Sequence, residues 1–182
     1  MTMNNELPQS SHKYHDGKYA ITSFEKGDRE FRRASCSVEG ICILPFDTNE
    51  NGSISNLYLS KYTDFMDGSD GYTCMSFDSN DQRSSDFEEL SSLINRELSI
   101  DTDVDDLYYL GEIKMPIPFS RSYRCYGLNL DKFIKKFDGF SAETSKDSPY
   151  DIQKVKASRV MRGEFQDSLV LSSCMLLLSY LD

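Results

Sequence analysis

Strand-like segments on both sides of one helical segment constrain the fold of this chain more than any other feature. Alternating apolar and polar residues predict strands in the first half at residues 18–24, 31–46, 54–62 and 72–78. A helical apolar period follows in Ser84–Ile100, and its face comprises Phe87, Leu90, Ile94 and Leu98. Two more strands are predicted at 107–115 and 120–131, and a closing amphipathic helix at 165–182. This order predicts an α+β fold in which helices cover a mixed sheet.

The domain organisation follows from the length and from the polar start of the chain. A chain of 182 residues is long enough for one domain with its own core. We expect residues 1–16 to be a mobile N-terminal tail and residues 17–182 to be a single domain. Residues 151–165 fit either a strand or a helical turn, and Asp167 is expected to cap the closing helix.

Charge and composition bound the class of partner. The formal net charge of -10 argues against sequence-independent nucleic-acid binding, because phosphates would be repelled, whereas a basic protein surface or a cation is compatible. No apolar run reaches the roughly 18 residues of a membrane span, and the first residues carry no secretory signal. We therefore expect a chain that is intracellular (cytoplasmic) or assembled into a particle inside a cell. Five isolated cysteines predict reduced, mostly buried thiols.

The stretch that starts at Asp47 has two interpretations. Asp47, Asn49, Asn51 and Gly52 copy the first half of a calcium-binding loop, but the twelfth position, which should be a bidentate carboxylate, is Tyr58. The Asn51-Gly52 pair between two predicted strands favours a hairpin turn instead, because both residues tolerate positive φ.

The order of the segments resembles the Nudix hydrolase family. Counterparts occur in that order, in Nudix domains of the nucleoside-diphosphate-sugar type, for ICILPFD, NLYLSKY, SSDFEELSSLINRELSI, LYYLGEI, YRCYGLNLD and QDSLVLSSCMLLLSYL. The resemblance runs from about Asp16 to the end of the chain and implies a Nudix-like α/β/α sandwich. In that family the box G-x5-E-x7-R-E-U-x-E-E-x-G-U, in which U is aliphatic, forms a helix. Its glutamates hold Mg²⁺ or Mn²⁺ for attack of water on a pyrophosphate.

Two registers of the box fit this chain. In the first register Ile100 is the final aliphatic residue, Ser99 replaces the family glycine, and the Glu-Glu pair becomes Arg96-Glu97. The second register reads Arg96-Glu97-Leu98 as the family's Arg-Glu-aliphatic step. It aligns Glu88 with the family's upstream glutamate and Asp101 with the second residue of the Glu-Glu pair. It also requires the helix to continue past Ile100 into DTDVDD, whose residues are poor helix formers.

Both registers leave the carboxylate set incomplete, so the resemblance implies a degenerate box without catalytic residues, metal or other cofactor. The alternative is a Mg²⁺- or Mn²⁺-dependent hydrolase of a nucleoside diphosphate derivative that uses Glu88, Glu97 and Asp101, with Glu97 and Asp101 on the metal. The aspartates of DTDVDD, residues 101–106, are expected to form a solvated turn.

The expected function is therefore that of a catalytically inactive scaffold or interaction protein. The segments ILPFD, NLYLSKY and LNLDKF are similar to Nudix-like proteins of large T-even-type tailed phages. That resemblance implies a structural component of a virion, in the tail or baseplate, packed against other proteins in a larger assembly. Exposed aromatic residues would make the contacts, and the candidates are Tyr58, Tyr62, Phe65 and Tyr72.

Overall fold

The structure is a computed structural model of the 182-residue chain. It describes residues 10–15, 19–26, 29–36, 39–63, 68–79, 86–115, 119–133, 151–165 and 167–181.

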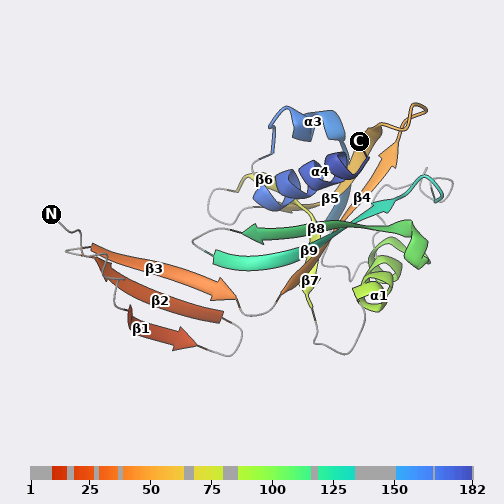
Figure 1. Cartoon of the computed structure of the whole chain (residues 1–182). Helices are drawn as coiled ribbons and strands as arrows, with labels where there is room; N and C mark the ends of the chain where they lie inside the picture. Colours follow the sequence, from red (N-terminus) through yellow and green to blue (C-terminus); the bar gives the residue numbers. More distant parts are fainter. Residues whose placement is uncertain are drawn as a thin grey trace.

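A mixed sheet organises the described part of the chain (Figure 1). Its strands are β1 (Ser10–His15), β2 (Tyr19–Lys26), β3 (Arg29–Cys36), β4 (Gly40–Thr48), β5 (Ile54–Thr63), β6 (Asp70–Thr73), β7 (Met75–Asp78), β8 (Leu107–Met115), β9 (Phe119–Asn129) and β10 (Asp151–Lys156). The main order is β1-β2-β3-β9-β4-β5-β10, with β6 on β5, β7 on β4 and β8 on β9. The β9 strand is parallel to β3 and β4, and the other pairs are antiparallel.

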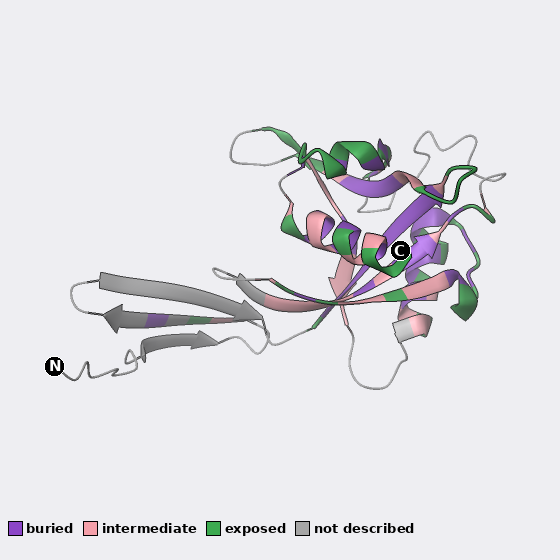
Figure 2. Cartoon of the chain, turned by 45° about the horizontal axis from the view of Figure 1, so that its top comes forward, coloured by how far each residue is buried: buried purple, intermediate pink, exposed green. Residues whose placement is uncertain are grey.

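The helices cover both faces of the sheet, as an α/β/α sandwich requires. They are α1 (Asp86–Leu98), α3 (Ala157–Met161) and α4 (Ser168–Leu181), and Val104–Asp106 form a 3₁₀ turn. Successive β4 side chains point to opposite faces because the side-chain period of a strand is two. Ile41 and Ile43 pack in the cluster that includes α1, whereas Cys42 and Leu44 pack in the cluster that includes α4. The buried residues gather on the central strands and on the helix sides that face them (Figure 2). The predicted α+β fold class is confirmed.

The β1–β3 strands form a small antiparallel sheet that extends away from the helices (Figure 1). Within the part of the chain that the structure describes, two residue pairs join β3 to β9, Ala34 with Phe119 and Ser35 with Ser120. Residues 1–16, which are expected to be a mobile tail, contain the strand β1. It forms because the backbone of β2 pairs with it along Ser10–His15. Residues 1–9 lie outside the described residues, and the division into a tail and one domain stays a prediction.

Two local expectations resolve in the structure. The strand predicted at 72–78 is two strands, because the chain leaves β5 and joins β4 at the buried Cys74. The ambiguous segment 151–165 contains both alternatives, a strand (β10) followed by a short helix (α3). Among the described residues, no helix combines the length and the apolar character that crossing a membrane would require.

Candidate functional site

The α1 helix carries the candidate box, and one of its faces is built into the core. Its buried apolar side chains lie in one cluster with Ile41 and Ile43 of β4, and they are Leu90, Leu93, Ile94 and Leu98. The sequence produces this face because apolar residues recur at three- and four-residue spacing. Glu97 lies one turn after Leu93 and is also buried, at 3% exposure.

The end of α1 decides between the two registers. Ser99 has φ of 54°, the left-handed conformation that commonly ends a helix, and its N–H donates to the Asn95 carbonyl over 2.9 Å. Ile100 follows and is fully buried. Glycine adopts this conformation without penalty, which matches the family pattern of a glycine before the last aliphatic residue. The chain leaves the helix at Leu98 and does not continue it through Asp101, which agrees with the helix end that the first register implies and not with the second.

In the first register, the resemblance places the family's three clustered glutamates at Leu93, Arg96 and Glu97. Leu93 is buried, and the Arg96 side chain is 65% exposed. The Glu97 side chain is completely buried, and its Oε1 accepts a hydrogen bond from Arg96 Nε over 2.5 Å. A guanidinium so placed brings a positive charge into contact with the Glu97 carboxylate.

The other carboxylates named from the sequence are distributed around α1 and beyond its end. Glu88 is exposed and stands nine residues before Glu97, which at about 100° per residue places the two on opposite sides of the helix. Asp101 is exposed, and its Oδ1 accepts a hydrogen bond from the Asn95 side-chain amide. The structure therefore does not bring Glu88 and Glu97 together.

The acidic segment after α1 is a turn in which one aspartate is buried. Asp106 is 6% exposed, and it accepts hydrogen bonds from the backbone N–H of Asp103 over 3.0 Å and from Lys132 Nζ. Burial raises the pKa of the Asp106 carboxyl, but these two donors outweigh burial, so its pKa lies below the ordinary value. The described residues contain no group of three or more His, Cys, Asp or Glu side chains positioned to hold a metal ion.

The hairpin prediction at Asp47 is confirmed, and it reveals a network that the sequence analysis did not identify. The turn is closed by Asn49 N–H to the Ser53 carbonyl over 2.9 Å, and Gly52 has φ of 78°. The Asp47 carboxylate does not face a loop centre. It is 3% exposed, and its donors are Asn56 (backbone and side chain), the Tyr58 hydroxyl at 3.0 Å and Lys154 Nζ at 3.2 Å. Burial, followed by the charge of Asp47, raises the pKa of Tyr58.

The expectation that the candidate aromatic residues are exposed is correct for one of them and wrong for another. Tyr58 is 2% exposed, because its hydroxyl donates a hydrogen bond to the buried Asp47 carboxylate. Tyr72 is half-buried, with its ring edge-on to Phe165 at 5.2 Å between centroids. Tyr62 is 43% exposed, and Phe65 lies outside the described residues.

The four cysteines whose side chains are described are free and buried, as the sequence predicted; they are Cys42, Cys74, Cys125 and Cys174. Cys42 and Cys125 are directly opposite each other on β4 and β9, with 2.9 Å between their sulfur atoms. The contact with Cys125 and then burial raise the pKa of the Cys42 thiol, and burial raises that of Cys74. The raised pKa values make the Cys42 and Cys74 thiols poor nucleophiles, because the reactive species is the thiolate.

Solved structures share this architecture. An ADP compounds hydrolase matches with a TM-score of 0.61 and 13% identity over 99% of this chain and 97% of its own. A MutT/Nudix family protein from Listeria innocua matches with a TM-score of 0.52 and 13% identity over 79% of this chain and 93% of its own. This chain has a Nudix-like fold. The C-terminal domain of mouse MUTYH, solved in complex with human PCNA, matches with a TM-score of 0.51 and 12% identity over 78% of this chain and 88% of its own. No family model and no curated protein matches the sequence.

Proposed function

We propose that this chain is a catalytically inactive protein with a Nudix-like fold, and that it works by binding other proteins. One observation carries the proposal. In the first register, which the left-handed Ser99 favours, the retained box glutamate would be Glu97, which is buried and ion-paired with Arg96 at the neighbouring glutamate position.

The donor set at these positions does not fit a divalent cation. Magnesium needs several oxygen ligands that converge on one octahedral site. Leu93 offers no ligand atom, and the positive Arg96 guanidinium repels a cation from the Glu97 carboxylate. Because the family reaction depends on the metal to stabilise developing charge on a pyrophosphate, a helix with this donor set lacks the feature that the reaction needs.

The proposed partners are proteins in a larger assembly. The formal charge of -10 favours a partner with a basic surface over a nucleic acid. The resemblance of ILPFD, NLYLSKY and LNLDKF to phage proteins supports a place in the tail or baseplate of a virion. Detection of the chain by mass spectrometry in purified, nuclease-treated particles would test that place directly.

The inactive scaffold and the hydrolase give opposite results with metal. The full chain should be incubated with ADP compounds and other nucleoside diphosphate derivatives, in Mg²⁺ and in Mn²⁺, beside an active Nudix hydrolase as positive control. We expect no product above background. We also expect no change in Tm, whereas 10 mM metal on a site with Kd of about 1 mM would stabilise the fold by about 1.4 kcal/mol.

The alternative, a Mg²⁺-dependent hydrolase, is favoured by the fold similarity to an ADP compounds hydrolase across almost the whole chain. Metal-dependent turnover that is lost in Glu97→Gln, with unchanged folding by circular dichroism, would establish that alternative and refute the inactive scaffold. The same variant should leave an interaction protein's binding unchanged.

A further inference from the structure

The β8 strand leaves one of its edges without a strand partner in the described part of the chain. Its inner edge pairs with β9 along Leu107–Met115, and no other described strand pairs with it. The ladder is irregular between Tyr109 and Gly111 and regular from Gly111 to Met115. An open edge presents a row of backbone donors and acceptors that another strand can complete.

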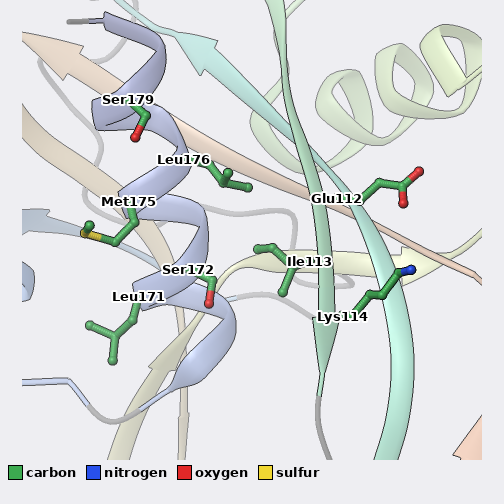
Figure 3. A pocket seen from close by; sticks show the side chains of 8 residues that line it. All are labelled: Glu112, Ile113, Lys114, Leu171, Ser172, Met175, Leu176 and Ser179. Atoms are coloured by element: carbon green, nitrogen blue, oxygen red, sulfur yellow. The ribbon is translucent and has the colours of Figure 1, made fainter.

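The side chains of the regular segment divide between the two faces of the sheet. Ile113 points toward α4, whereas Glu112 and Lys114 point away from it (Figure 3). Glu112 and Lys114 are both exposed, and neither forms an ion pair within the described residues. The cation opposite Glu112 on β9, Arg124, binds Glu39 and Ser79 instead.

The α4 helix borders this edge with an uncharged surface. Ser168–Leu181 contains no acidic or basic residue, although Met175 is 61% exposed and Tyr180 is 52% exposed. The helix packs on β8, and an open hollow of about 470 Å³ lies where the two elements meet the surface; its lining comprises Glu112, Ile113, Lys114, Leu171, Ser172, Met175, Leu176 and Ser179. A strand added to β8 would thus lie beside an apolar wall, which an isolated soluble helix would normally cover with charges.

We propose that the strand that completes this edge is β8 of a second copy of the chain. In a two-fold antiparallel pair centred on Ile113, Glu112 of each copy lies opposite Lys114 of the other. Opposite charges directly across an antiparallel pair attract, and the symmetry provides two such pairs. On the α4 side, Gly111 would face Met115 of the second copy. Because glycine has no side chain, the large Met115 side chain has room there.

The register follows from the same charges. Residues that face each other in an antiparallel pair share a face of the sheet, so a symmetric pair is centred on a residue. A centre at Glu112 would oppose the two glutamates, and a centre at Lys114 would oppose the two lysines. Ile113 is also the middle of the regular segment Gly111–Met115. Both the backbone and the charges therefore favour one self-pairing.

This assignment rests on the proposed function, because it names the partner of an interaction protein as its own copy. It also places the uncharged surface of α4 beside the proposed interface. The two-fold axis stands perpendicular to the joined sheet, so the α4 helices of both copies lie on one side of it.

Charge exchange tests the pairing. The mass of the full chain in solution should be measured by sedimentation from about 1 to 100 µM, a range that brackets micromolar dimers. We expect a dimer, and we expect Glu112→Lys and Lys114→Glu each to weaken it by about tenfold or more, because each places like charges opposite in both pairs. The double exchange should restore the dimer, and a mixture of the two single variants should form a heterodimer.

Net charge alone predicts a different pattern. Glu112→Lys lowers the net charge from -10 to -8 and should strengthen association if long-range repulsion dominates. Glu50→Lys, in the exposed turn between β4 and β5, makes the same charge change away from β8 and is the matched control. It should leave the dimer intact.

A chain that stays monomeric at about 100 µM overturns the self-pairing and leaves the edge to an extended peptide of another protein. A dimer in which the double exchange fails to restore association also overturns it. These outcomes leave the proposed inactivity untouched, because turnover is assayed separately. Hydrolysis by an intact dimer would refute the inactivity and leave the interface standing.

Discussion

Replacement of Ser99 by glycine should stabilise the protein. Ser99 is exposed and has φ of 54°, a conformation that costs an L-residue about 1–2 kcal/mol because its Cβ crowds the backbone. Glycine removes that strain and keeps the N–H donated to Asn95. Glycine also has more conformational freedom in the unfolded chain, and this lowers the gain in stability by about 0.4–1 kcal/mol. We therefore expect Ser99→Gly to raise the free energy of unfolding by about 0.5–1 kcal/mol, or Tm by about 1–4 °C in a chain of this size.

The matched control is Ser92→Gly, an exposed serine inside the same helix. Glycine there is expected to lower stability by about 0.5–1 kcal/mol, because a helix interior gives it no compensating relief of strain. Urea unfolding followed by circular dichroism at 222 nm should show opposite shifts of the midpoint for the two variants, at equal slopes.

The result also bears on function, because the register of the box depends on how α1 ends. If Ser99→Gly destabilises the chain as much as Ser92→Gly does, Ser99 is not in the left-handed conformation. The assignment of Leu93, Arg96 and Glu97 to the family's glutamate positions would then lose its structural basis.

Three further predictions concern buried polar groups. Asp106→Asn should lower stability by about 1–2 kcal/mol at pH 7. Because the folded pKa of Asp106 is below the unfolded one, its contribution is present above the unfolded pKa and is lost as pH falls through the folded pKa, so the variant and the parent should converge in acid unfolding. Asp47→Asn should cost about 2–4 kcal/mol in urea unfolding, since a buried acceptor with several donors is lost. Cys42 and Cys125 should resist iodoacetamide in the native protein and react in guanidinium, as peptide mapping would show; rapid native labelling would contradict their burial.

Local patterns in the sequence were sufficient to predict most of the elements. The strand predicted at 107–115 matches β8, and the hairpin turn at Asn51-Gly52 forms as expected. Both depend on neighbours in the chain, namely an alternating run and a dipeptide that tolerates positive φ. The cap of α4 is equally local: Asp167 Oδ1 accepts the Val170 N–H over 2.9 Å.

Features that depend on distant residues could not be predicted. Tyr58 was expected at the surface, but Asp47, across the hairpin, holds its hydroxyl inside. The break at Cys74 arises because the segment changes from β5 to β4 as its partner. The sequence leaves the register of the box ambiguous because both options place Glu97 on α1, and the left-handed backbone of Ser99, which favours the first, depends on the folded helix end. The spacing of Glu112 and Lys114 in a predicted strand indicates that they share a face, but the open edge of β8 beside them depends on distant strands.

The short junction between β3 and β9 affects how the chain unfolds. Among the described residues, two residue pairs join β3 of the three-stranded sheet to β9, whereas β4 and β9 share seven. Separating so few pairs takes little free energy, so β1–β3 can detach as a cooperative unit while the sandwich stays folded. Amide hydrogen exchange would register this as two protection levels, a lower one before Cys36 and a higher one from Gly40 onward. A force applied near the start of the chain would be relieved at Ala34 and Ser35 before it reached the core.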